Sequence, residues 1–137
     1  MKKLFILLAL CMGTLSFSQE EDYSKLNWLT DFDQAAKESQ ISNKPILMYF
    51  TGSDWCGPCK SLKTDFFNSD AFIVKSENFV LLEIDMPRRS DIITPEQKAK
   101  NIILIKKYNP NGGYPNIVAL NKKLQVIGEL SRLYLFT

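Results

Sequence analysis

Two cysteines three positions apart, Cys56 and Cys59, are the residues of this chain whose type and spacing can do redox chemistry. They lie in the stretch Trp55-Cys56-Gly57-Pro58-Cys59. Residues three apart on a helix share one face, with Cα atoms roughly 5 Å apart, inside the window of roughly 4.4–6.8 Å that a disulfide requires. The spacing therefore predicts two thiols that close into a disulfide and open again with little movement of the backbone.

A Cys-x-x-Cys pair has other uses, and the composition argues against two of them. A structural zinc site needs four protein ligands, whereas this sequence has no histidine and no second cysteine pair. Haem attachment would require a histidine where Lys60 stands. A static structural disulfide stays open as an alternative. We favour a redox-active pair, because Gly57 and Pro58 separate the cysteines and Trp55 precedes them.

The segments on either side of the pair predict a junction between a strand and a helix. Residues 45–50 form a short apolar run typical of a buried strand, and residues 51–54 end it. A helix is expected to begin near Cys56, with Pro58 in its first turn, where a missing N–H loses no partner. The positive end of the helix dipole favours a thiolate on Cys56. We therefore expect Cys56 to attack as the nucleophile and Cys59 to resolve the intermediate.

The rest of the chain predicts further helices and strands. Thr30 is the expected N-cap of a first helix, with Asp33 three residues later, and Thr94 followed by Pro95 is the expected start of a later helix. Strands are expected at residues 79–85, 116–120 and 124–130, the last two joined by a hairpin turn at 121–123. Together these elements predict an α/β domain.

With these residues and motifs in place, the sequence resembles the thioredoxin family, whose active-site motif is Trp-Cys-Gly-Pro-Cys. The resemblance covers most of the chain after the first two dozen residues and includes the stretch Gly113-Tyr114-Pro115. It implies a thioredoxin fold, with a central mixed sheet flanked by helices. It also implies that Pro115 is cis and lies beside the dithiol, and that an extended substrate peptide binds at Tyr114.

The same resemblance implies a function and a substrate site. Members of the family exchange their dithiol with disulfides of proteins or peptides, without a cofactor, and a second thiol-disulfide protein recharges them. The resemblance implies that Cys56 and Cys59 are catalytic and that the substrate-binding residues are Trp55, Gly57, Pro58, Tyr114 and Pro115. For Trp55, a role in packing alone is the alternative. The Gly57-Pro58 pair resembles the reducing members, which favours a reductase or isomerase over a strong oxidase.

Three parts of the chain depart from the family pattern. The connection over residues 86–113 is longer than in plain thioredoxins, and it is similar to that of secreted bacterial thioredoxin-like proteins and related disulfide-reductase domains. Only residues 131–137 remain where the family has a long C-terminal helix, so we expect that helix to be shortened. Tyr49 stands in place of the family's buried aspartate, and Leu81 in place of its lysine partner. The proton acceptor for Cys59 is therefore left unassigned.

Four charged residues near the expected site have more than one interpretation. Asp54 and Glu83 are candidates for the proton acceptor, although the sequence alone brings neither of them close to Cys59. Arg88 and Arg89 belong to a basic loop, which we interpret as solvated in preference to a contact for a partner protein.

The N-terminal residues predict export from the cytoplasm. Residues 1–18 read as a secretory signal peptide, followed by a flexible segment at 19–27 and a thioredoxin-like domain at 28–137. The apolar run is too short for a bilayer, which takes about 20 residues, so we expect no stable membrane insertion. Lipidation of Cys11 is the less favoured alternative, because Leu10 stands where lipoproteins have a small residue. We expect a secreted, periplasmic protein.

The length and the net charge of the chain narrow the class of protein further. A chain of 137 residues with 45% hydrophobic residues fits one globular domain. Loss of Lys2 and Lys3 with the signal would leave 15 basic against 15 acidic residues, because the full chain has 17 and 15. A neutral balance predicts neither nucleic acid nor an acidic membrane as a partner. Our first hypothesis is a thiol-disulfide oxidoreductase acting on protein disulfides, and the alternative is a thioredoxin-fold binding module with a structural disulfide.

Overall fold

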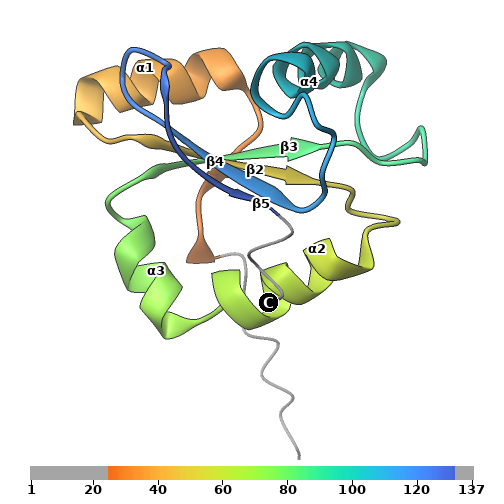
Figure 1. Cartoon of the computed structure of the whole chain (residues 1–137), viewed down its shortest axis with the longest axis horizontal. Helices are drawn as coiled ribbons and strands as arrows, with labels where there is room; N and C mark the ends of the chain where they lie inside the picture. Colours follow the sequence, from red (N-terminus) through yellow and green to blue (C-terminus); the bar gives the residue numbers. More distant parts are fainter. Residues whose placement is uncertain (1–24, 132–137) are drawn as a thin grey trace, which may run out of the picture.

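The computed structural model describes residues 25–131, in which a five-stranded mixed sheet is covered by helices on both faces (Figure 1). The strand order is β1-β3-β2-β4-β5. The strands are β1 (Trp28–Leu29), β2 (Ile46–Thr51), β3 (Val80–Asp85), β4 (Asn116–Leu120) and β5 (Val126–Ser131). The helices are α1 (Phe32–Ser42), α2 (Gly57–Leu62), α3 (Asp70–Ser76) and α4 (Pro95–Tyr108), and a π-helical segment, η2 (Lys63–Phe67), continues α2. The expected mixed sheet flanked by helices is confirmed.

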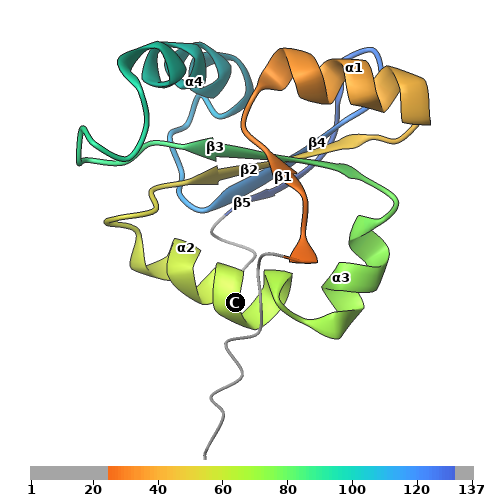
Figure 2. The ribbon, with the colours of Figure 1, turned by 180° about the vertical axis from the view of Figure 1, so that it is seen from behind.

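Alternation of side chains along β2 divides the core into two layers. Successive side chains of a strand point to opposite faces. Ile46, Met48 and Phe50 therefore belong to one buried cluster, whereas Tyr49 belongs to the other, against which Leu47 packs. Helices α1 and α4 cover the first face, and α2 and α3 cover the second, as Figures 1 and 2 show. Tyr49 is thus placed on the face that α2 covers.

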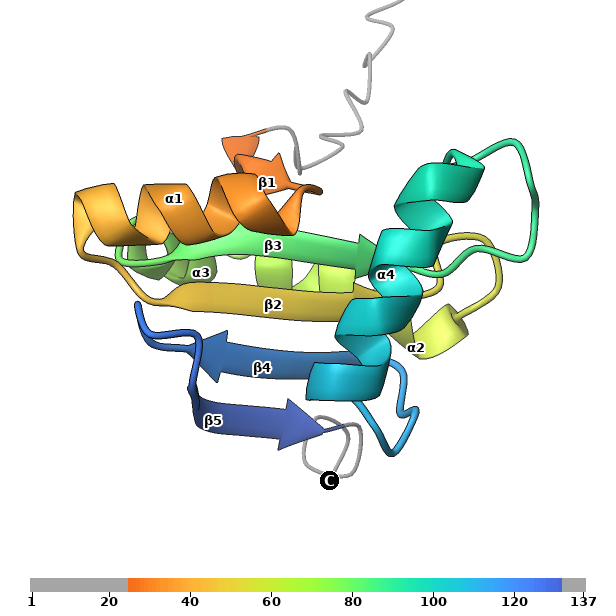
Figure 3. The ribbon, with the colours of Figure 1, turned by 90° about the horizontal axis from the view of Figure 1, so that it is seen from above.

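The register of β2 brings two distant segments to one edge of the sheet. β2 runs parallel to β3 and antiparallel to β4, with Phe50 opposite Ile84 on one side and Asn116 on the other. The end of β2, which leads into the cysteine motif, therefore lies beside the start of β4, which follows Tyr114 and Pro115 (Figure 3). This pairing is what brings the two parts of the expected site to the same edge.

The first helix is capped one residue later than the sequence predicts. Asp31, not Thr30, is the N-cap of α1: its backbone is extended, and Gln34 N donates to its Oδ1 at 2.9 Å. The Asp31 carboxylate also pairs with Lys100 of α4 at 3.0 Å. The Thr30 carbonyl instead accepts from Gln97 Nε2 at 3.0 Å. The prediction of Thr30 was wrong because both residue types cap well, and only the contacts to α4 distinguish them.

The segment before α1 is part of the sheet, which the sequence analysis did not predict. Trp28 and Leu29 pair in parallel with Leu81 and Leu82 as the edge strand β1 (Figure 2). Leu26, within the segment expected to be flexible, is already buried in the cluster on the α2 face. A strand of two residues carries too short an alternation to be read from sequence.

The long connection before β4 contains α4, as expected. Thr94 caps this helix by accepting from Gln97 N at 3.1 Å, and Pro95 stands in its first turn. The buried Asn101 side chain donates to the carbonyl of Asp85, the last residue of β3, at 2.7 Å. This bond fastens α4 to the edge of the sheet where the cysteine motif lies.

Two further expectations lie wholly or mainly outside residues 25–131. The signal peptide at 1–18 precedes the described part of the chain, and the shortened C-terminal helix expected at 131–137 would begin at Ser131, which ends β5.

Within the described residues, a groove of about 330 Å³ with mainly apolar lining lies over β4 and β5 and is bounded by Phe66, Phe72 and Leu130. None of the described helices combines the length and the apolar character that crossing a membrane would demand.

Candidate dithiol site

Cys56 and Cys59 form a disulfide at the start of α2, with an S–S distance of 2.01 Å and a Cα–Cα distance of 5.2 Å. Cys56 is the N-cap, and its Sγ accepts from Cys59 N at 3.2 Å. A helix N-terminus presents unpaired N–H groups and partial positive charge, both of which stabilise a thiolate. The residue at the N-cap is therefore the one whose sulfur the helix favours as an anion.

Both cysteines are almost covered by the protein. The exposed fraction is 3% for Cys56 and 1% for Cys59. Both belong to the buried cluster between the sheet and the α2–α3 layer, with Leu62, Phe67 and Ile117. Within this buried cluster, the feature that distinguishes Cys56 from Cys59 is its position as the N-cap of α2.

Tyr49, which stands in place of the family's buried aspartate, lies against Cys59. It is 1% exposed, and its hydroxyl donates to the carbonyl oxygen of Cys59 at 2.9 Å. Burial raises the pKa of Tyr49 to about 12, so the hydroxyl stays a neutral donor at physiological pH. Alternation along β2 indicates the face on which Tyr49 lies, but only the packed structure shows this bond. Tyr49 thus links β2 directly to Cys59 at the start of α2.

Replacing Tyr49 with phenylalanine is expected to lower the free energy of unfolding of the oxidised protein by about 0.5–1.5 kcal/mol, the net contribution of one hydrogen bond. The loss stays modest because the Cys59 carbonyl also accepts from Lys63 N. Urea unfolding measures the difference. A Tyr49→Phe protein as stable as the wild type would show that this bond contributes nothing to the stability of the fold.

Trp55 is fixed in place by contacts on several sides. Its Nε1 donates to the carbonyl of Met86 at 2.8 Å, and its ring meets Tyr114 edge to face, with centroids 5.5 Å apart. Gly52 lies directly against the indole: a Cβ at that position would stand 2.3 Å from Trp55 Cε2. The indole is thus held in one position beside Cys56, in contact with Tyr114.

The Tyr114-Pro115 peptide bond is cis, as the resemblance implied. Pro115 is buried, and Tyr114 is partly exposed with its ring against Trp55. Partial burial raises the pKa of the Tyr114 phenol. Of the residues inside the motif, Gly57 is exposed and Pro58 partly buried. The structure therefore places Trp55 against Tyr114, and gives the other predicted substrate-binding residues positions in the motif or at the start of β4.

The carboxylates of Asp54 and Asp85 accept hydrogen bonds from backbone and hydroxyl donors. The Asp54 carboxylate accepts from the backbone N–H groups of Arg88 and Arg89, at 3.0 and 2.9 Å. The Asp85 carboxylate accepts from Ser53 N at 2.9 Å and from Ser53 Oγ at 2.5 Å. These acids hold the loop after β3 against the motif, a role that the sequence analysis missed because it depends on contacts across more than thirty residues.

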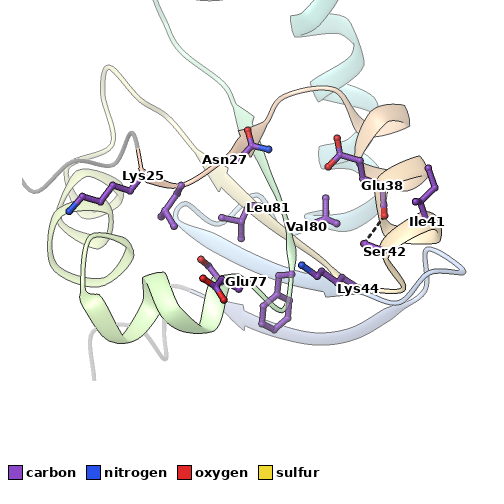
Figure 4. Close-up of a pocket in the computed structure, with 12 residues that line it drawn as sticks. Lys25, Asn27, Glu38, Ile41, Ser42, Lys44, Glu77, Val80 and Leu81 are labelled. Atoms are coloured by element: carbon purple, nitrogen blue, oxygen red, sulfur yellow. Dashed lines mark hydrogen bonds between the residues drawn. The ribbon is translucent and has the colours of Figure 1, made fainter.

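A second cavity lies at the far end of the sheet from the motif, where β2 and β3 begin. It has a volume of about 400 Å³, and its walls include Glu38 and Lys44, Phe79 and Glu77 (Figure 4). None of the predicted site residues lines it. This cavity is therefore separate from the cysteine site.

The mixed sheet, the cis proline before β4 and the disulfide at the start of α2 define a thioredoxin-fold protein with a dithiol site. The chain belongs to the thioredoxin-like family, since the model of that family matches residues 27–122. Solved structures agree: a DsbH oxidoreductase superposes with a TM-score of 0.71 and 27% identity, over 77% of this chain and 72% of that one.

The sequence relatives include two proteins of Chlamydia pneumoniae. The chain is 30% identical over 108 residues to the thioredoxin-related protein DsbJ of Chlamydia pneumoniae, covering 77% of this chain and 30% of that protein. It is 29% identical over 99 residues to the disulfide bond reductase DsbH of the same organism, covering 72% of this chain and 58% of that protein. The chain thus spans less than two thirds of the length of either relative.

Proposed function

We propose that this protein is a thiol-disulfide oxidoreductase that exchanges its Cys56–Cys59 pair with disulfides of proteins or peptides. The position of the two cysteines carries the proposal. Cys56 is the N-cap of α2, its Sγ accepts a hydrogen bond from Cys59 N, and the two sulfurs form a disulfide. A helix N-terminus lowers the cost of the Cys56 thiolate that exchange requires.

In the reducing direction, the reaction has two exchange steps. The Cys56 thiolate attacks one sulfur of the substrate disulfide, forming a mixed disulfide and releasing the other substrate sulfur as a thiolate. The Cys59 thiolate then attacks Cys56 Sγ, which releases the second substrate thiolate and forms the Cys56–Cys59 disulfide. Two electrons pass from the protein to the substrate. Before the next turnover, a second thiol-disulfide protein must supply two new electrons by reducing the Cys56–Cys59 disulfide.

The substrate is proposed to bind as an extended segment beside the cis proline. Trp55 and Tyr114 form an aromatic wall there, and the peptide before β4 offers backbone groups to a strand-like partner. Gly57 leaves open space above the motif, since nothing lies within 4 Å of the position a Cβ would take there. Pro58 and Pro115 complete the proposed substrate site.

We infer a reductase or isomerase in preference to a strong oxidase. The Gly57-Pro58 pair supports this direction, as does the similarity to a relative named disulfide bond reductase. Secretion to the periplasm is proposed from residues 1–18 alone. An oxidising compartment makes a recharging partner necessary for a reductase.

The proposal predicts catalysed reduction of a protein disulfide. With dithiothreitol as the electron source, the protein should accelerate insulin reduction, followed by the turbidity of the released B chain, and Cys56→Ser should abolish the acceleration. Recovery of ribonuclease activity from the scrambled enzyme separates an isomerase from a plain reductase. If insulin precipitates no faster than with dithiothreitol alone, the pair is not an exchange centre, and the binding-module hypothesis takes its place.

A further inference from the structure

The loop that follows β3 is fastened to the residues just before Cys56. Asp54 accepts from the backbone amides of Arg88 and Arg89, and Trp55 Nε1 donates to the carbonyl of Met86. In addition, Met86 N donates to the carbonyl of Thr51 at 2.9 Å. The backbone of Arg88 is therefore held at a defined place beside the dithiol motif.

The two arginines of this loop differ in their partners. Arg89 donates from Nε and Nη2 to the two carboxylate oxygens of Asp91, so its charge is neutralised within the loop. The Arg88 guanidinium instead lies 4.9 Å from the centroid of the Trp55 ring. Within residues 25–131 it forms no ion pair. A guanidinium stacked on an aromatic ring keeps its N–H groups free for a carboxylate.

A second cation lies close to Asp54. Lys60, on α2 one turn after Cys56, directs its ammonium toward the carbonyl of Asp54 at 3.5 Å. Partial desolvation of Asp54 opposes its ionisation, but the amides of Arg89 and Arg88 outweigh this and hold its pKa below the usual value. That carboxylate is thus occupied by the loop amides, and the side chains of Lys60 and Arg88 keep their charge for a partner.

We propose that Arg88, assisted by Lys60, selects partner segments that carry aspartate or glutamate beside the reacting cysteine. Trp55 contacts both Arg88 and Tyr114, so the cation adjoins the place where the extended segment is proposed to bind. A carboxylate of the partner would accept from the free N–H groups of Arg88 while its cysteine meets Cys56. This inference rests on the proposed exchange function and adds the class of partner to it.

The size of the effect follows from the exposure of these charges. Arg88 and Lys60 are both exposed, and exposed ion pairs contribute little, so we expect a preference of about threefold to fivefold for the acidic partner. Because the Debye length is about 10 Å at 0.1 M salt, the preference should shrink as salt is added. Charge complementarity of this kind acts mainly on the rate of encounter.

The test uses two disulfide-bonded peptides that differ only in the residues beside their cysteines, aspartate in one and asparagine in the other. Prereduced protein is mixed with each peptide, and tryptophan fluorescence gives the second-order rate constant of a single turnover at low and high salt. The ratio of the two rate constants is compared among wild type, Arg88→Gln, Arg88→Lys and Lys107→Gln. Lys107 is the matched control, a cation on the ring of Tyr108 in α4.

The proposal predicts that the acidic peptide reacts faster with wild type and that salt narrows the gap. Arg88→Gln should lower the ratio at least twofold, while Arg88→Lys retains most of it and Lys107→Gln leaves it unchanged. An equal ratio in wild type and Arg88→Gln would overturn the inference and leave the exchange function standing. If dithiothreitol reduces both peptides but the protein reduces neither, the proposed function fails, and the inference fails with it.

Discussion

Replacing Cys59 with serine should trap the protein on its substrate. Cys56 would still attack a disulfide, but the thiolate that resolves the mixed disulfide would be missing. The expected product is a covalent adduct through Cys56, and turnover should fall by roughly three orders of magnitude or more, as when a covalent nucleophile is removed. Non-reducing electrophoresis of the variant with a disulfide-bonded protein shows the adduct, and mass spectrometry assigns the sulfur.

The matched control is Cys56→Ser, which keeps Cys59 in place. This residue is 1% exposed and is not the N-cap, so it should form little adduct. The two single variants lose the same disulfide, so any effect on stability is shared and only the reactivity of the remaining sulfur differs. Equal adduct formation by both variants would contradict the assignment of Cys56 as the attacking residue.

Gly52→Ala should damage the fold at the dithiol site. The added Cβ would meet the Trp55 ring at 2.3–2.6 Å, far inside van der Waals contact. The ring cannot give way easily, because Met86 and Tyr114 hold it from other directions. We expect a loss of about 1–3 kcal/mol in the free energy of unfolding from overpacking, and about 1 kcal/mol more if the hydrogen bond to Met86 breaks. Urea unfolding of the oxidised protein measures the loss.

Gly57→Ala is the control for this substitution, since a Cβ on Gly57 would meet nothing within 4 Å. The residue is the first of α2, and alanine is a better helix former than glycine, so its stability should be unchanged or slightly raised. If Gly52→Ala proves as stable as Gly57→Ala, the indole does not occupy the place described here.

The elements around the cysteines were predictable because their signals are local. The apolar run before the motif predicted β2, and Pro58 together with the cysteine spacing predicted the start of α2. Thr94 and Pro95 likewise marked the start of α4. The cis state of Pro115 came from the family resemblance, since spacing alone shows only a turn before a strand.

The contacts that complete the site were not predictable, because they join residues far apart in sequence. The bond from Tyr49 to the Cys59 carbonyl depends on how α2 packs on the sheet. Asp54 accepts hydrogen bonds from the loop after β3, and Arg88 of that loop stacks on Trp55. Both contacts depend on the path that the loop takes. Arg88 and Arg89 are both exposed, and the contact of Arg88 with the Trp55 ring is an addition that the sequence did not predict.

The reduction potential of the Cys56–Cys59 pair tests the central claim most directly. The protein is equilibrated in glutathione and dithiothreitol buffers of known potential, and the reduced fraction is read from tryptophan fluorescence and confirmed by alkylation of free thiols. A reductase or isomerase should give a midpoint between about −270 and −180 mV. A pair that stays oxidised below about −300 mV would be a structural disulfide, which would contradict the proposed exchange function.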